Sequence, residues 1–238
     1  DEAGGAALAS QSDGRMTFVR TDVTREGDIV ALLAAADAAG GLDVLFNNAG
    51  AGGAREPIGE IAAADWDATM ALLLRSVALG IRHAAPLMAK QGGGAIVNTS
   101  SVSALGSGYA PTAYSTAKAG VLHLTRLAAA DLAGDGIRVN AVVPGFITTS
   151  IFTRHLDIAG EKLAAADAVI AGVAARAQPI PRAGRAEDVA AAVAFLASDD
   201  ASFVTGTHIL VDGGMLVGTQ ASWDRRSPSL FTALEALR

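Results

Sequence analysis

The most specific chemical signal in the sequence is a tyrosine and a lysine four residues apart. Tyr114 and Lys118 lie in an Ala-rich stretch that predicts a helix, and residues at i and i+4 share one face of a helix. A phenol with its ordinary pKa near 10 is a poor base at neutral pH, unless a neighbouring cation favours the phenolate. The pair therefore indicates proton-transfer chemistry. The alternative is a tyrosine packed at a helix start beside a solvated lysine.

Three predicted strand ends place polar residues and glycines at one edge of a sheet. Ser101 follows the predicted strand 94–100, the segment 47–50 (Asn-Asn-Ala-Gly) ends the strand before it, and 144–149 (Pro-Gly-Phe-Ile-Thr-Thr) ends the strand after it. In a doubly wound sheet, ligands bind outside the carboxyl ends of the strands. Small residues there let the backbone approach a ligand closely. The pattern predicts a nucleotide site at this edge, with Ser101 beside it.

The elements that must position these residues follow an alternating pattern. Short runs rich in Val, Ile and Leu alternate with Ala-rich helical stretches, which predicts an α/β fold with a doubly wound parallel sheet. The predicted strands are 16–20, 42–46, 94–100, 137–143 and 208–211, and the predicted helices are 1–10, 25–39, 64–90, 113–132 and 186–197. A helical pair in 151–178 is expected to form a lid over the site. We predict one domain, 1–217, and a tail, 218–238, with a short helix at 230–238.

Composition excludes several classes of protein. The chain has 238 residues, 18 basic and 24 acidic, with a net charge of −6, which argues against nucleic-acid binding. It has no cysteine, and its four histidines lack metal-ligand spacing, so no metal site is expected. Mean hydropathy is +0.37, but the longest uncharged run, 91–117, is rich in Gly, Ser and Thr. We expect a cytoplasmic protein with no membrane or nucleic-acid partner and no secretion signal.

With these motifs the sequence resembles the short-chain dehydrogenase/reductase family from residue 1 to about residue 214. Ser101 and Tyr114-x-x-x-Lys118 match its catalytic set, and Asp212-Gly213-Gly214 resembles the end of its last strand. The resemblance implies a Rossmann-like fold and hydride exchange between NAD or NADP, with NAD preferred, and an alcohol or carbonyl carbon. It implies these cofactor-binding residues: Asp22, Val23, Asn48, Ala49, Gly50, Tyr114, Lys118, Pro144, Gly145, Ile147 and Thr149.

The resemblance also implies a role for each member of the catalytic set. Tyr114 would be the general acid or base, with its pKa lowered by Lys118, and Lys118 would also bind the nicotinamide ribose. Ser101 would donate a hydrogen bond to the substrate oxygen. The implied substrate is a secondary alcohol or its ketone, and it is expected to be hydrophobic because 151–178 is rich in Ala, Ile, Leu and Val. The four-residue spacing from Tyr114 to Lys118 disfavours the enoyl-reductase branch, and the chain lacks the larger substrate domain of the epimerase branch.

Two departures from the family pattern support a rival hypothesis, a non-catalytic scaffold that does not bind the cofactor. Leu73 stands where a helical asparagine usually takes part in a proton relay, and no Gly-rich strand-to-helix turn for the pyrophosphate occurs in the sequence. We expect that turn, with two further strands, in about 30 or more residues upstream. Association into a homodimer or homotetramer is expected through helices 64–90 and 113–132.

Overall fold

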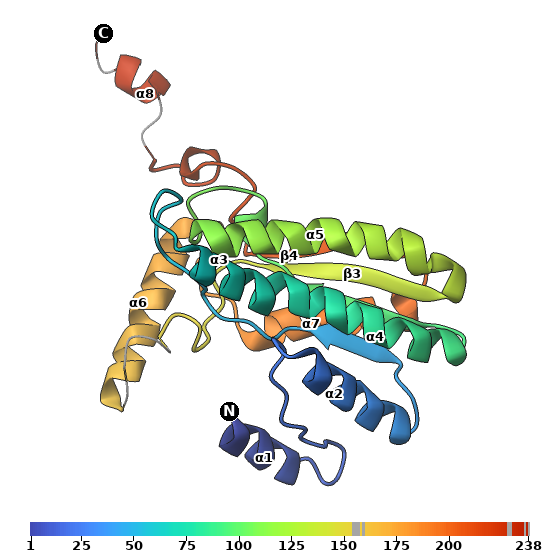
Figure 1. The fold of residues 1–238 in the computed structure, drawn as a ribbon. Helices are drawn as coiled ribbons and strands as arrows, with labels where there is room; N and C mark the ends of the chain where they lie inside the picture. The colour runs from blue at the N-terminus through green and yellow to red at the C-terminus, as the bar shows by residue number, and fades with distance from the viewer. Residues whose placement is uncertain (154–157, 159, 228–229, 236, 238) are drawn as a thin grey trace.

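A four-stranded parallel sheet forms the centre of the molecule, with strand order β1-β2-β3-β4 (Figure 1). The computed structural model describes residues 1–153, 158, 160–227, 230–235 and 237. The strands are β1 (Val44–Asn47), β2 (Gly94–Thr99), β3 (Ile137–Pro144) and β4 (His208–Val211). The central strands β2 and β3 are buried over almost their whole length, as the continuous apolar runs in the sequence predict.

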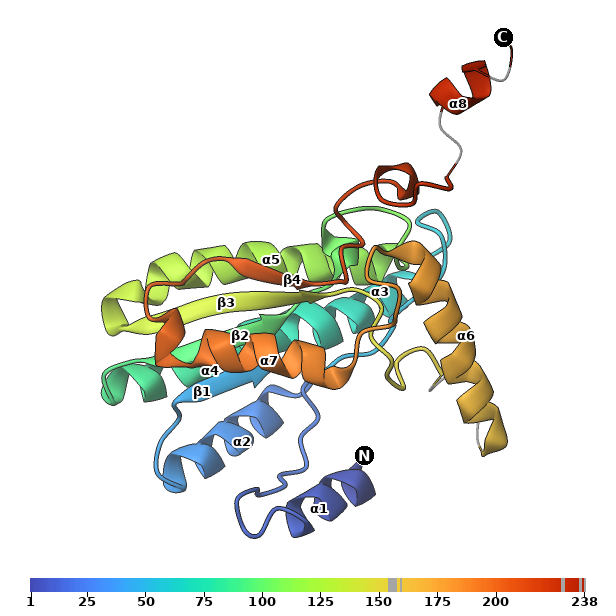
Figure 2. The ribbon, with the colours of Figure 1, turned by 180° about the vertical axis from the view of Figure 1, so that it is seen from behind.

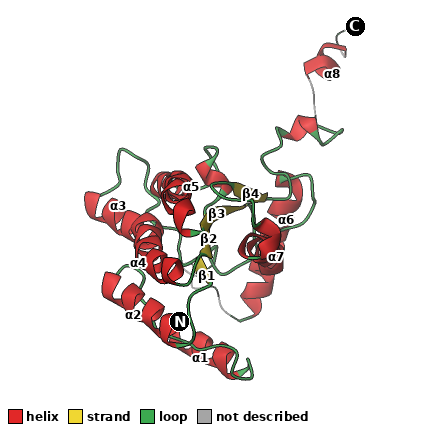
Figure 3. Ribbon diagram, turned by 90° about the vertical axis from the view of Figure 1, so that its right-hand side faces the viewer, coloured by secondary structure: helices red, strands yellow, loops and turns green. Residues whose placement is uncertain are grey.

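Helices cover both faces of the sheet (Figures 1 and 3). On one face lie α4 (Ser76–Lys90) and α5 (Thr112–Leu132), with α2 (Glu26–Ala38) packed against α4. Seen from behind, α7 (Ala186–Ala197) crosses the opposite face (Figure 2). This arrangement confirms the predicted α/β fold with a doubly wound parallel sheet.

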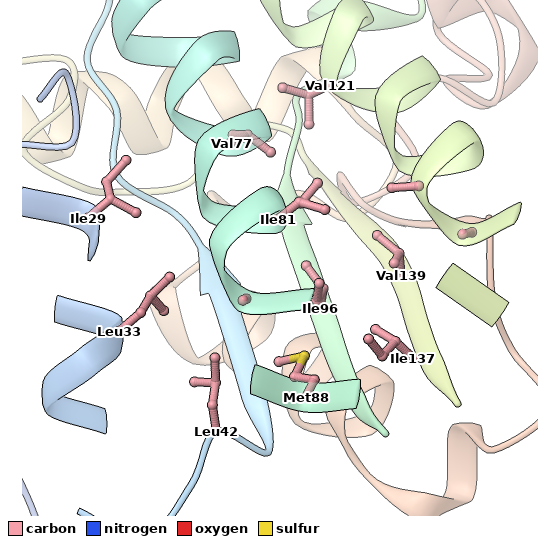
Figure 4. Close-up of a cluster of buried hydrophobic side chains, with 13 residues drawn as sticks. Ile29, Leu33, Leu42, Val77, Ile81, Met88, Ile96, Val121, Ile137 and Val139 are labelled. Carbon is pink, nitrogen blue, oxygen red and sulfur yellow. The ribbon is translucent and has the colours of Figure 1, made fainter. Parts of the chain in front are cut away.

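The main core lies between the sheet and the layer formed by α2, α4 and α5 (Figure 4). Ile29 and Leu33 of α2 and Met88 of α4 pack there with Ile96 of β2 and Val139 of β3. A smaller cluster of Val97, Val142 and Leu196 fills the space under α7. The strands that carry the predicted site are therefore held from both sides.

The predicted strand 16–20 is wrong, because this segment has no regular secondary structure. A strand needs a neighbour to satisfy its backbone N–H and C=O groups, and among the described residues no strand lies beside β1 on the side away from β2. The segment instead lies against the first helix, α1 (Glu2–Ser10), where the ring of Phe18 occupies the space beside Gly5.

The long helix expected over 64–90 is interrupted. It consists of α3 (Ala63–Met70), a π-helical turn over Ala71–Arg75, and α4. A π turn inserts one residue into a helix without altering its apolar composition, so the Ala- and Leu-rich pattern gives no sign of it. By length and composition Ala63–Lys90 passes the test for a membrane span, as core helices of globular proteins also do.

The lid segment and the tail differ from their predictions in detail. In 151–178 the described residues form a turn over 151–153 and one helix, α6 (Glu161–Ala177), instead of a helical pair. Residues 154–157 and 159 of the predicted pair lie outside the described residues. The tail carries the short helix α8 (Leu230–Glu235), which projects away from the sheet (Figure 1).

Candidate active site

Tyr114 and Lys118 lie on one face of α5, as their spacing predicts. The Lys118 Nζ atom is 5.7 Å from the centroid of the Tyr114 ring. α5 begins at Thr112, directly after Pro111, whose fixed φ suits the residue before a helix. Both side chains therefore come from the first two turns of a helix packed on β3 and facing the end of β2.

Lys118 is only 4% exposed, which is unusual for a lysine. Its Nζ atom donates a hydrogen bond of 2.7 Å to the carbonyl oxygen of Thr99, and its own carbonyl oxygen accepts one of 2.7 Å from the Ser100 hydroxyl. Burial disfavours the charged ammonium group and lowers the pKa of Lys118 to about 8.

Ser101 is placed by the turn that follows β2. Its backbone is extended, and its Oγ atom accepts a hydrogen bond of 3.2 Å from the Ser103 N–H at the start of a short 3₁₀ turn. Burial raises the pKa of Tyr114, and the neighbouring Ser101 hydroxyl, which favours the phenolate, lowers it by less. The pKa of Tyr114 is therefore raised in this structure. The lowering expected from Lys118 is therefore not present in the chain by itself.

The Asn-Asn-Ala-Gly segment at the end of β1 is joined to β2 by side-chain hydrogen bonds. Asn47 Nδ2 donates to Asn98 Oδ1 at 2.9 Å, and Asn48 Oδ1 accepts from the Thr99 hydroxyl at 3.0 Å. Asn98 Nδ2 in turn donates to the Thr125 hydroxyl of α5 at 3.0 Å. Ala49 and Gly50 follow as exposed residues at the same edge of the sheet.

The segment 144–149 at the end of β3 is held by two neighbouring segments. An added Cβ at Gly145 would lie 2.9 Å from Asp212 Cα, so only glycine permits this close approach. Ile147 forms a parallel bridge with Gly184: the Gly184 N–H donates to the Phe146 carbonyl at 2.7 Å, and the Thr148 N–H donates to the Gly184 carbonyl at 2.9 Å. The segment that would face the nicotinamide is thus fixed on both sides.

Asp22 and Val23 lie in a different environment, before α2. Asp22 is exposed, and its Oδ1 atom accepts hydrogen bonds from the N–H and hydroxyl of Thr24 at 3.0 and 2.7 Å. These bonds lower the pKa of Asp22. The turn is anchored to the helical layer by Arg75, which donates to the Thr24 carbonyl at 2.8 Å.

Several residues of the site were not predicted from the sequence. Hydrogen bonds to the catalytic set, or to the strand that carries it, come from Thr99, Ser100, Asn98 and Thr125. Leu73, which replaces the expected asparagine, is fully buried in the π turn, and an added Cβ at Gly50 would lie 3.2 Å from its Cδ2 atom. Leu73 thus fills the space beside the Asn-Asn-Ala-Gly segment.

The described residues fit one half of a nicotinamide dinucleotide. The buried amine of Lys118, the Tyr114 hydroxyl and the close packing at Gly145 suit the nicotinamide and its ribose. A Gly-rich turn for the pyrophosphate does not occur in the 238 residues. In the described part of the chain, no group of three or more His, Asp or Glu residues could hold a metal ion.

Comparison with known proteins shows the family. A family model described as enoyl-(acyl carrier protein) reductase matches residues 1–216. The chain is 44% identical over 201 residues to cis-4-hydroxycyclohexanecarboxylate dehydrogenase of Sinomonas cyclohexanicum, covering 84% of this chain and 76% of that protein. It is 38% identical over 209 residues to (+)-borneol dehydrogenase 2 of Salvia officinalis, covering 87% of this chain and 73% of that protein.

Solved structures agree with these matches. The crystal structure of levodione reductase superposes with a TM-score of 0.78 at 35% identity, covering 92% of this chain and 84% of that one. A short-chain type dehydrogenase/reductase from Mycobacterium ulcerans superposes with a TM-score of 0.76 at 31% identity, covering 99% of this chain and 81% of that one. With the Tyr114–Lys118 pair and Ser101 in place at the sheet edge, these matches show that the chain belongs to the short-chain dehydrogenase/reductase family.

Proposed function

We propose that the protein is an NAD(P)-dependent oxidoreductase that interconverts a secondary alcohol and its ketone. The observation that carries this proposal is the convergence of Ser101, Tyr114 and Lys118 at the carboxyl edge of the sheet, with Lys118 buried beside the tyrosine. Membership of the family supports it, as do the relatives named as dehydrogenases of hydroxycyclohexanecarboxylate and of borneol. The four-residue Tyr–Lys spacing favours alcohol chemistry over enoyl reduction.

In the proposed reaction the chain moves a proton while the bound nicotinamide supplies or accepts a hydride. Tyr114 takes the proton of the alcohol in oxidation and returns it in reduction. The Lys118 amine, when it is protonated, stabilises the Tyr114 phenolate, and it also binds the nicotinamide ribose. Ser101 donates a hydrogen bond to the substrate oxygen, and the Ser103 N–H occupies a lone pair of Ser101 Oγ, which orients the serine as a donor.

The substrate is proposed to be hydrophobic. Phe146, directly after Gly145, packs against Phe152 with ring centroids 5.9 Å apart and ring planes tilted by 34°. Leu105 and Tyr109 are exposed on the loop between Ser101 and Tyr114. These apolar groups flank the strand ends that carry the catalytic set. They suit a compact apolar ring or chain bearing one hydroxyl group.

NAD is proposed as the cofactor, ahead of NADP. We further propose a homodimer or homotetramer assembled through 64–90 and 113–132. On α5 the side chain of Leu127 is exposed, which would be covered in such an assembly. Size-exclusion chromatography with light scattering tests this proposal, and a Leu127→Glu variant is expected to shift the protein toward the monomer.

The decisive experiment measures cofactor binding and turnover. The full-length protein is titrated with NAD and NADP by calorimetry, and its reduction of either cofactor is followed by absorbance with a panel of cyclic and open-chain secondary alcohols. Turnover of at least one alcohol with NAD supports the proposal. Cofactor binding without turnover of any alcohol or ketone, or no binding at all, would favour the scaffold hypothesis, to which Leu73 also points.

A further inference from the structure

Three consecutive residues, beginning with the last residue of β2, each face a different part of the catalytic helix α5. The Thr99 carbonyl accepts a hydrogen bond from Lys118 Nζ, the Ser100 hydroxyl donates one to the Lys118 carbonyl, and the Ser101 hydroxyl acts on the pKa of Tyr114. Lys118 is thus attached at both ends, through its side chain and through its main chain. The middle contact, from Ser100, belongs to no group assigned a chemical role.

The Ser100 hydroxyl is buried, with 2% of the residue exposed. A serine hydroxyl has one proton to donate, and Ser100 uses it to cross from the strand end to a helix carbonyl 2.7 Å away. A carbonyl oxygen has two lone pairs, so Lys118 can accept this bond in addition to the one within its helix. Ser76, a buried serine at the start of α4, instead donates to the carbonyl of Leu72 one turn earlier in the same helical segment.

We propose that Ser100 is a positioning residue, which holds the main chain of Lys118 against the end of β2 and so keeps the lysine amine beside Tyr114. It acts through Lys118 and contacts neither substrate nor cofactor. This inference rests on the proposed function, because it assigns Ser100 a part in the reaction that Tyr114 and Lys118 carry out.

The physical reason is the length and burial of the lysine side chain. Four rotatable bonds separate its main chain from Nζ, and burial favours any movement that returns the amine to water. The bond from Nζ to Thr99 fixes one end only. The bond from Ser100 fixes the other end, and with it the position of the helix turn that also carries Tyr114. A displacement of about 1 Å at a reacting group can cost about 100-fold in rate.

The test compares Ser100→Ala with a matched control, Ser76→Ala, which removes a buried serine hydroxyl that bonds the Leu72 carbonyl one turn earlier. Ser100→Ala is expected to lower kcat by about 10- to 100-fold, with a KM for the alcohol within about threefold. Ser76→Ala also removes one buried hydroxyl and one hydrogen bond, and it is expected to keep kcat within about threefold. Ser100→Thr, which keeps the hydroxyl, is expected to recover most of the lost kcat.

A crystal structure of Ser100→Ala gives a readout that does not depend on activity. The expected result is a distance from Lys118 Nζ to the Thr99 carbonyl longer than the 2.7 Å of the parent protein. An unchanged distance together with kcat within threefold overturns the proposal, as does an equal loss of kcat in Ser76→Ala or no recovery in Ser100→Thr. Failure of the proposed function is distinguishable, because the parent protein itself would then turn over no alcohol, whereas the distance from Lys118 Nζ to the Thr99 carbonyl in Ser100→Ala would still report on the role of Ser100.

Discussion

The region around β2 and α5 and the region formed by residues 1–47 are built in different ways. In β2 four consecutive residues are buried, whereas in β1 the residues alternate between exposed and half-buried positions. Val97 of β2 is fully buried, and Val44 of β1 is 41% exposed. α5 buries eight residues, and α1 buries none. The apolar sequence of the two strands is similar, so the difference comes from their neighbours.

Hydrogen bonding differs between the two regions in the same way. Around β2 the side-chain bonds join segments far apart in sequence, such as Asn98 to Thr125 and Ser100 to Lys118. In residues 1–24 the side-chain hydrogen bonds that the structure shows span two to six residues, as in the turn at Asp22, with the one exception of the bond from Arg75 to the Thr24 carbonyl. Long-range bonds fix one element against another, whereas local bonds fix only a turn. Precise positioning for chemistry is therefore expected from the β2–α5 region.

The largest expected effect is on turnover. Tyr114→Phe removes the proposed acid and base without changing the volume of the ring, so kcat should fall by about 10²- to 10⁴-fold. The matched control is Tyr109→Phe, at the other tyrosine of the chain. Tyr109 is exposed, and this variant should keep kcat within about threefold. Steady-state kinetics on both variants decides the matter. Near-normal oxidation by Tyr114→Phe would show that the proposed mechanism is wrong.

The second prediction compares how much a buried valine of β2 and an exposed valine of β1 contribute to the free energy of unfolding. Val97→Ala removes two buried methyl groups and leaves a cavity between β2 and α7, so the free energy of unfolding should fall by about 2–3 kcal/mol. Val44→Ala changes the same atoms at an exposed position of β1 and should cost less than about 1 kcal/mol. Denaturant unfolding measures both. Equal losses would mean that β1 is buried in solution, contrary to its exposure in the structure.

The same comparison explains how far the sequence predicts the structure. The order of helices and parallel strands and the Tyr114–Lys118 face follow from periodicity, because these features depend on residues close in sequence. Strand 16–20 was predicted wrongly, since a β-rich run forms a strand only beside a partner. Ser100 was missed because its bond to Lys118 spans 18 residues and exists only once α5 packs on the strand ends. The π turn could not be predicted either, because one inserted residue leaves the apolar composition of the helix unchanged.

The third prediction concerns the stability cost of burying Lys118. Burial lowers its pKa to about 8, from 10.5 in the unfolded chain, so at pH 7 the folded protein holds an unfavourable buried charge. Lys118→Met should therefore raise the free energy of unfolding of the cofactor-free protein by about 1–2 kcal/mol at pH 7, after allowing for the lost hydrogen bond to Thr99.

The pH dependence of that difference has a definite sign. Between pH 8 and 10.5 the unfolded chain binds more protons at this lysine than the folded protein does, so the stability of the parent protein rises with pH. The advantage of Lys118→Met should shrink across this window and be smallest near pH 10.5. Thermal unfolding at pH 7, 8.5 and 10 measures it. A variant less stable than the parent at pH 7 would contradict the burial argument.

The smallest effect is expected in the first region, at Asp22, which the family resemblance places beside the adenine. In Asp22→Asn the amide side chain keeps an oxygen that can accept from the Thr24 N–H and hydroxyl, so the turn before α2 should persist. One charged acceptor becomes neutral, which changes a single hydrogen bond to the cofactor by about 1 kcal/mol. The Kd for NAD should rise by less than about tenfold, with kcat unchanged. Calorimetric titration measures the Kd, and Asp22→Leu, which loses the turn as well, should weaken binding further. A loss beyond 100-fold in Asp22→Asn would show that the first region positions the cofactor as strictly as β2 and α5 position the catalytic set.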